Sequence, residues 1–160
     1  MKTTHLLCGV ALLATIPGCD RTDTLGPPQI LIGDSMCAEC GMIISDERYA
    51  TATLYPSSRG TDAMLFDDFN CQRQYETAHI ERVPSKRWSH DYATLEWFET
   101  ENAYFALSEQ LRTPMGSGVA AFASKESAIQ FAQSINGVVQ VFNEIWNVPS
   151  EGTSSNHDGG

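Results

Sequence analysis

Basic residues are scarce in this chain of 160 residues, which has 10 Lys and Arg against 20 Asp and Glu and a formal charge of −10. A surface with this balance repels nucleic acid, which we therefore exclude as a partner. The sequence also lacks a nucleophilic triad, a phosphate-binding loop and a flavin motif. We expect no catalytic turnover, so a binding role is favoured.

Long apolar runs are missing except near the N-terminus, where residues 6–16 form a run too short to span a membrane comfortably. A single lysine precedes it, which is typical of an export signal, predicted over residues 1–18. Ile16-Pro17-Gly18-Cys19 resembles the lipobox of bacterial lipoproteins, in which the Cys19 thiol is acylated. Asp20 resembles a signal for retention in the inner membrane. We expect a protein held on the periplasmic side of that membrane by its lipid.

The rest of the chain suits one folded domain between two polar segments. Residues 19–35 contain the Gly-Pro-Pro of a tether, and residues 149–160 form a Ser-, Gly- and Asp-rich tail that we expect to be disordered. We predict the domain over residues 36–148, with a first half at about 36–92 and a second half at about 93–148.

The pattern of strands and helices is similar in the two halves. In the first half it predicts strands at 49–55 and 63–66 joined as a hairpin, a helix from 69 to about 80 that begins at Asp67-Asp68, and a strand at 86–92. In the second half it predicts strands at 103–107 and 119–122, a helix capped by Ser124, and a strand at 138–142. The predicted fold is α+β, with two pseudo-repeated ββαβ halves packed as one unit.

The stretch Met36-Cys37-Ala38-Glu39-Cys40-Gly41-Met42 places two thiols and two thioethers within seven residues. Such soft ligands favour a soft ion, Cu(I) before any hard cation. Haem attachment would need a His where Gly41 stands, and a zinc site would want a second compact Cys or His pair. Disulfide exchange remains open, although Gly41 and Ile43-Ile44 disfavour the helix start that would activate its thiolate.

Within this stretch, Cys40 is the candidate thiolate ligand, and Cys37 is a second thiolate or a redox partner. Met42 or Met115 is the candidate thioether; Met115 lies in a Pro- and Gly-rich loop between two predicted strands, where functional side chains often occur. A structural disulfide between Cys37 and Cys40 is an alternative in an exported protein.

Other residues are assigned less direct roles. Cys71 shares one helical face with Tyr75 and Ala78, so we expect a small buried side chain there rather than a ligand. His90 and Asp91 are candidates for residues that orient the metal ligands without binding the metal themselves.

A set of short motifs, in the order in which they occur behind the lipobox, resembles the signature of the NosL family. The set comprises Cys40-Gly41-Met42, Phe66-Asp67-Asp68, Asp91-Tyr92 with Trp97, and Pro114-Met115-Gly116-Ser117-Gly118 followed by Ala121-Phe122. The resemblance implies a periplasmic Cu(I) chaperone that delivers copper towards the copper–sulfide cluster of nitrous oxide reductase, beside a membrane transporter complex. It also implies two related ββαβ halves, similar to the organomercurial lyase fold.

Three other readings compete with a copper chaperone. One is a thiol–disulfide oxidoreductase that uses Cys37 and Cys40, and another is a lyase that splits a metal–carbon bond, which rests on fold analogy alone. The third is an acidic structural lipoprotein. Copper affinity combined with little thiol exchange would distinguish the chaperone from all three.

Overall fold

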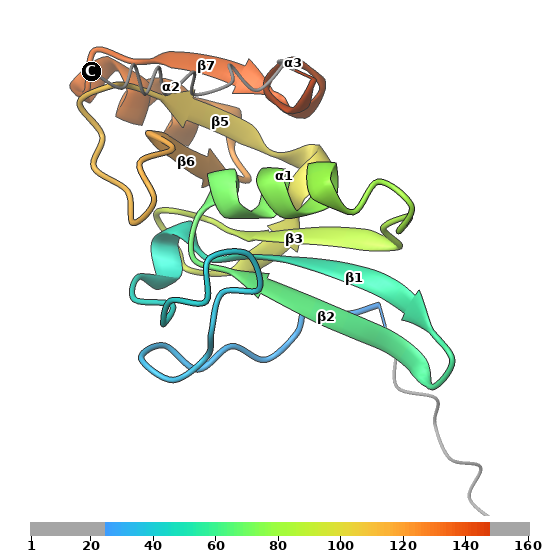
Figure 1. Cartoon of the computed structure of the whole chain (residues 1–160). Coiled ribbons are helices and arrows are strands. Elements are labelled where there is room, and N and C mark those ends of the chain that lie inside the picture. Colours follow the sequence, from blue (N-terminus) through green and yellow to red (C-terminus); the bar gives the residue numbers. More distant parts are fainter. Residues whose placement is uncertain (1–24, 148–160) are drawn as a thin grey trace, which may run out of the picture.

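Two antiparallel sheets, one above the other in Figure 1, make up most of the described part of the chain, residues 25–147 of the computed structural model. The predicted export signal, the lipidation at Cys19, the start of the tether and the tail at 149–160 lie outside these residues. No helix within residues 25–147 is long and apolar enough to cross a membrane.

The first half forms a four-stranded sheet. A short 3₁₀ helix, Glu47–Tyr49, precedes it, and the strand order is β2-β1-β3-β4. Helix α1 packs against β1 and β2. The elements are β1 (Thr51–Ser57), β2 (Gly60–Phe66), α1 (Phe69–Ala78), β3 (Lys86–His90) and β4 (Trp97–Glu99). The predicted hairpin is confirmed, because β1 and β2 pair antiparallel along their whole length.

The second half forms a three-stranded sheet with the order β6-β5-β7, covered by α2. A 3₁₀ helix, Thr100–Asn102, leads into it. The elements are β5 (Tyr104–Leu107), β6 (Val119–Phe122), α2 (Lys125–Ser134), β7 (Val138–Val141) and α3 (Phe142–Trp146). In both sheets the first strand of the ββαβ unit lies between the second and the third. The predicted α+β fold with repeated ββαβ halves is therefore confirmed; β4 and α3 are additions that the sequence pattern did not predict.

The first strand continues through Pro56 to Ser57, beyond its predicted end at residue 55. Proline lacks an N–H and is normally excluded from central strands. Here β3 pairs with β1 only between residues 51 and 54, so Pro56 faces β2 alone, opposite Thr61. The turn is consequently shorter than predicted, with Gly60 at a φ of +127° that favours glycine.

Side chains cap both long helices where the sequence predicted. The Asp68 carboxylate accepts a hydrogen bond from the Asn70 N–H at 2.8 Å, and the Ser124 hydroxyl accepts one from the Ser127 N–H at 3.3 Å. Each cap satisfies a backbone donor that the helix itself leaves unpaired. The α1 helix ends at Ala78, two residues before the predicted end.

Aromatic side chains join the two halves. The Phe69 ring, at the start of α1, lies 5.2 Å from the Phe105 ring and 5.5 Å from the Trp146 ring. On the other side, the Tyr92 ring lies 5.6 Å from Phe122 and 4.5 Å from Phe131. Burial of such large apolar groups couples the halves, so the start of α1 is held in a fixed position against the second half.

Candidate metal centre

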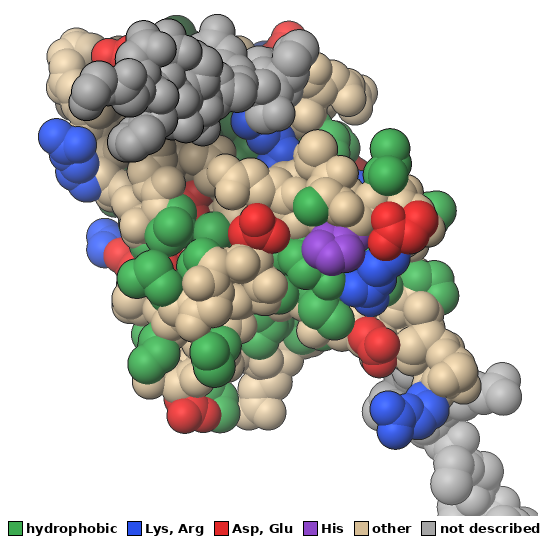
Figure 2. Space-filling model, viewed as in Figure 1, with side chains coloured by type: hydrophobic (Ala, Val, Ile, Leu, Met, Phe, Trp, Pro, Cys, Tyr) green, Lys and Arg blue, Asp and Glu red, His purple; other side chains and the backbone are tan. Residues whose placement is uncertain are grey.

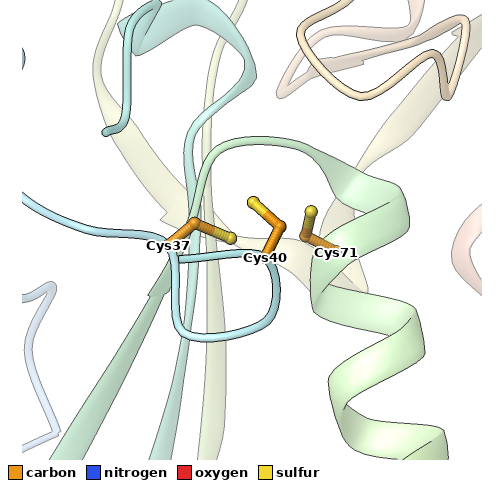
Figure 3. Close-up of side chains that lie close together, drawn as sticks. All are labelled: Cys37, Cys40 and Cys71. Atoms are coloured by element: carbon orange, nitrogen blue, oxygen red, sulfur yellow. The ribbon is translucent and has the colours of Figure 1, made fainter. Parts of the chain in front are cut away.

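Three thiols meet beside the start of α1. The Sγ atoms of Cys37, Cys40 and Cys71 all lie within 4.8 Å of one another, and all three cysteines are free. Figure 3 shows Cys37 and Cys40 on one loop and Cys71 on the facing helix, with their sulfurs near one another. Cys37 and Cys71 are buried, and Cys40 is partly exposed. The arrangement offers three soft sulfur ligands, which can ionise to thiolates, for one metal ion.

The loop with Cys37 and Cys40 is a tight turn between two short extended segments. The Cys37 N–H donates to the Met42 carbonyl at 2.8 Å, and the Ile44 N–H donates to the Ser35 carbonyl at 2.8 Å. Gly41 supplies the positive φ of +72° that the turn requires. No helix begins at the Cys-x-x-Cys motif, as the sequence predicted.

Cys71 reaches the cluster because the cap at Asp68 places it in the first turn of α1. Its burial agrees with the expectation of a small core residue, but its neighbours are two thiols. The helical pattern identifies the buried face of α1 without telling what covers it. Two features of the sequence could have identified Cys71: the odd number of cysteines, three, within residues 25–147, and its position just after a helix cap, where a thiolate is stabilised.

The three thiols share protons unequally. The Cys71 S–H donates to the Cys37 sulfur, and together with backbone N–H groups of Cys40, Asp67 and Glu39 it lowers the pKa of Cys37 to about 5. The pKa of Cys71 is raised, because its proton is held in that hydrogen bond. Burial raises the pKa of Cys40. At neutral pH the cluster thus holds a thiolate on Cys37, ready to bind a cation.

Two adjacent carboxylates tie this cluster to its surroundings. Asp67 is buried and accepts a hydrogen bond from the Ser45 N–H at 2.9 Å, which anchors the segment after the cysteine loop. Burial raises the pKa of Asp67. Asp68 caps α1 and also accepts from the Met115 N–H at 3.0 Å. The β5–β6 loop of the second half is therefore attached to the helix end that carries Cys71.

The predicted thioether ligands lie at the surface. The Met42 side chain is 56 % exposed, and the Met115 side chain is 37 % exposed. The Met42 N–H donates to the Cys40 sulfur. Both residues are therefore attached to the neighbourhood of the cluster through their backbones, and their roles as ligands remain predictions.

His90 and Asp91 make contacts between elements. The His90 Nδ1 donates to the Ala50 carbonyl at 3.0 Å, and its ring lies 3.6 Å from the Trp97 ring. Asp91 accepts from the Ala123 N–H at 2.8 Å, which connects the end of β3 with the end of β6. These contacts give both residues a part in holding the halves together. Support of the metal ligands by His90 and Asp91 stays a prediction.

The fold and the motifs agree with comparisons to known proteins. The crystal structure of the copper chaperone NosL from Shewanella denitrificans is similar, with a TM-score of 0.62 and 20 % identity over 76 % of this chain and 98 % of that chain. At this identity the likeness concerns the fold. No curated protein sequence matches the chain. The NosL family model matches residues 28–148, well over half of the chain. The chain belongs to the NosL family.

Proposed function

We propose that this protein is a Cu(I) chaperone that carries its cargo on Cys37, Cys40 and Cys71. The observation that carries the proposal is the approach of three Sγ atoms, from two segments of the chain, to within 4.8 Å of one another. Thiolates are soft ligands, and Cu(I) is among the first-row metal ions that such ligands select. Family membership supports the same cargo, since the similar solved protein is named a copper chaperone.

The sulfur positions suit one central ion. Thiolates bound to a single metal at about 2.3 Å, the distance in zinc sites, lie about 4 Å apart. The three thiols need only small side-chain movements to reach such an arrangement. Three ligands satisfy Cu(I), whereas a structural zinc site takes four. We therefore expect Cu(I) to bind more tightly than Zn(II).

Release of the ion is as important to a chaperone as its capture. Cys40 is the least buried of the three thiols, so we assign it to the exchange of copper with a partner. Met42 and Met115 are exposed neutral donors, suited to stepwise ligand exchange. Figure 2 shows hydrophobic side chains over the segment that precedes β1, and this exposed set comprises Leu31, Ile32, Met36, Met42 and Ile43.

We base the proposed compartment and recipient on the N-terminal sequence and on the family. The lipobox at Cys19 supports a lipid anchor on the periplasmic side of the inner membrane. Membership of the NosL family supports delivery of copper towards the copper–sulfide cluster of nitrous oxide reductase, beside its membrane transporter complex. The protein itself performs no catalysis in this scheme.

A thiol–disulfide oxidoreductase is the second candidate, because the pKa of Cys37 is lowered to about 5 by the Cys71 hydrogen bond. An attacking thiolate must reach the disulfide of its substrate. Cys37 is only 2 % exposed, and the more accessible Cys40 has a raised pKa. The reactive and the accessible sulfur are thus different atoms, which favours metal binding.

An anaerobic Cu(I) titration of the reduced protein tests the proposal, in competition with a chromophoric Cu(I) chelator. We expect the parent protein to retain one Cu(I) per chain in the presence of the chelator. We expect Cys40→Ser to lower the Cu(I) affinity by about 100-fold or more, because loss of a ligand should exceed the effect of losing a residue that only supports a ligand. Met115→Leu is compared with Met64→Leu, which alters a partly buried methionine of β2 in the same way.

Two outcomes would decide against copper. Loss of all bound Cu(I) to the chelator in the parent protein would reject the chaperone. Rapid reduction of a peptide disulfide by the reduced, metal-free protein, with a disulfide formed among its own cysteines, would favour the oxidoreductase instead.

A further inference from the structure

We propose that Asp68 is a positioning residue that fixes the loop carrying Met115 against the helix end carrying Cys71. This inference rests on the proposed copper site and adds a residue that binds no copper itself. It explains how a ligand from the second half could be held beside thiols that all belong to the first half.

The Asp68 carboxylate is fully buried, and its two oxygens serve two different segments. Oδ1 accepts from the Asn70 N–H at 2.8 Å, within α1. Oδ2 accepts from the Thr113 hydroxyl at 2.6 Å, the Met115 N–H at 3.0 Å and the Ser117 N–H at 3.4 Å, all in the β5–β6 loop. Four donors thus converge on one side chain, and three of them come from 45 or more residues away.

The loop is folded around this carboxylate. Because the Thr113 hydroxyl donates to Asp68, it accepts in turn from the Ser117 hydroxyl at 3.1 Å and from the Gly118 N–H at 3.3 Å. The Gly116 N–H closes the turn by donating to the Thr113 carbonyl at 3.1 Å. With the acceptor removed, the partly buried N–H groups of Met115 and Ser117 would be left without this partner, which is costly to the extent that water cannot replace it.

The same carboxylate defines where Cys71 lies. Asp68 is the N-cap of α1, and Cys71 is the third residue of that helix. In Figure 1 the β5–β6 loop extends from the second half towards the first. The positions of the Cys71 thiol and of the Met115 backbone therefore both depend on the Asp68 carboxylate. The spacing between Met115 and the cysteines depends on it as well.

Substitutions can separate the two duties of Asp68. In Asp68→Asn, the amide oxygen can still cap α1, but the amide nitrogen cannot accept from the Met115 and Ser117 N–H groups. In Asp68→Ser, the shorter hydroxyl keeps a good cap and does not reach the loop. Ser124→Ala removes the corresponding cap of α2 and serves as the matched control for loss of a helix cap.

The first measurement needs no copper. With the methionine methyl groups labelled with ¹³C, the NMR signal of Met115 is compared between the parent, Asp68→Asn, Asp68→Ser and Ser124→Ala. We expect a shifted, narrower Met115 signal in both Asp68 variants, because the loop is released, and an unchanged one in Ser124→Ala. An unchanged Met115 signal in two folded Asp68 variants would overturn the proposal.

The second measurement is the anaerobic Cu(I) competition with Asp68→Asn, Met115→Leu and the double variant. We expect each single variant to weaken Cu(I) binding by about tenfold. The double variant should be no weaker than either single variant, because Asp68 acts through Met115. Additive losses, or no loss in Asp68→Asn, would overturn the positioning role while leaving the chaperone in place. Failure of the parent to hold Cu(I) would instead reject the proposed function, and the positioning role with it.

Discussion

The two halves of the molecule share a topology but differ in what they bury. Within residues 25–147, every buried polar or charged side chain lies in the first half or at its boundary: Thr51, Thr53, Asp67, Asp68, Gln72, Ser89, His90, Asp91 and Thr100. Between residues 103 and 147 the buried side chains are Ala, Val, Ile and Phe. Buried polar groups are costly unless they are paired, and their concentration distinguishes the first half, which also contains the proposed copper site.

Equivalent positions make the difference specific. Each helix starts three residues after a strand ends in Phe66 or Phe122. The first half has Asp68 at the cap and Cys71 three residues later, whereas the second half has Ser124 and Ser127 there. The repeat supplies the same scaffold twice, and only one copy carries the thiol. The second half contributes its β5–β6 loop instead.

The largest expected effect tests whether the two scaffolds are equally important for stability. Phe66 and Phe122 are equivalent and almost completely buried, at 0 % and 2 % exposure. We expect Phe66→Ala and Phe122→Ala each to lower the free energy of unfolding by about 3–5 kcal/mol. Chemical denaturation measures this, and a single transition is expected in each case because the halves share aromatic contacts. Separate transitions for the two halves would show that they unfold independently, contrary to this prediction.

The next effect tests whether the chemistry is confined to one half. Cys71→Ser should weaken Cu(I) binding by about 100-fold or more, again because loss of a ligand exceeds the effect of losing a supporting group. Ser127→Ala, at the equivalent position of α2, should leave the affinity within about twofold of the parent, as additivity of distant sites predicts. The chelator competition measures both. Equal affinities of the parent and Cys71→Ser would remove Cys71 from the ligand set.

The smallest effect concerns the buried histidine of the first half. Burial lowers the pKa of His90 below its ordinary value of 6.5, so the folded state prefers the neutral ring. Its contribution is fully present above pH 6.5 and is lost as the pH falls and the unfolded state takes up the proton. For each unit by which the pH falls in this window, the His90 ring lowers the free energy of unfolding by at most about 1.4 kcal/mol. We expect the unfolding free energy of His90→Asn to fall less steeply than that of the parent between pH 6.5 and 5.

A parallel pH dependence in the parent and His90→Asn would show that His90 does not titrate in this range. The variant suits this comparison because its amide N–H can take the place of the Nδ1 donor to the Ala50 carbonyl.

Local patterns in the sequence were sufficient for the scaffold. Strand pairs flanking a turn, the caps at Asp68 and Ser124, and the apolar faces of the helices are decided by neighbours within a few residues. The same is true of the cysteine loop, where Gly41 fixes the turn and prevents a helix. These features were predicted because their physical causes lie within one segment.

Tertiary structure alone decided the membership of the thiol cluster and the anchoring of the Met115 loop. Cys71 is 31 residues from Cys40, and Asp68 is 47 residues from Met115. A helical pattern shows that Cys71 is buried, but the partner that buries it depends on how the cysteine loop packs against α1. The two acidic residues at a helix start indicate a cap, and only the packed halves show that one oxygen remains for a distant loop.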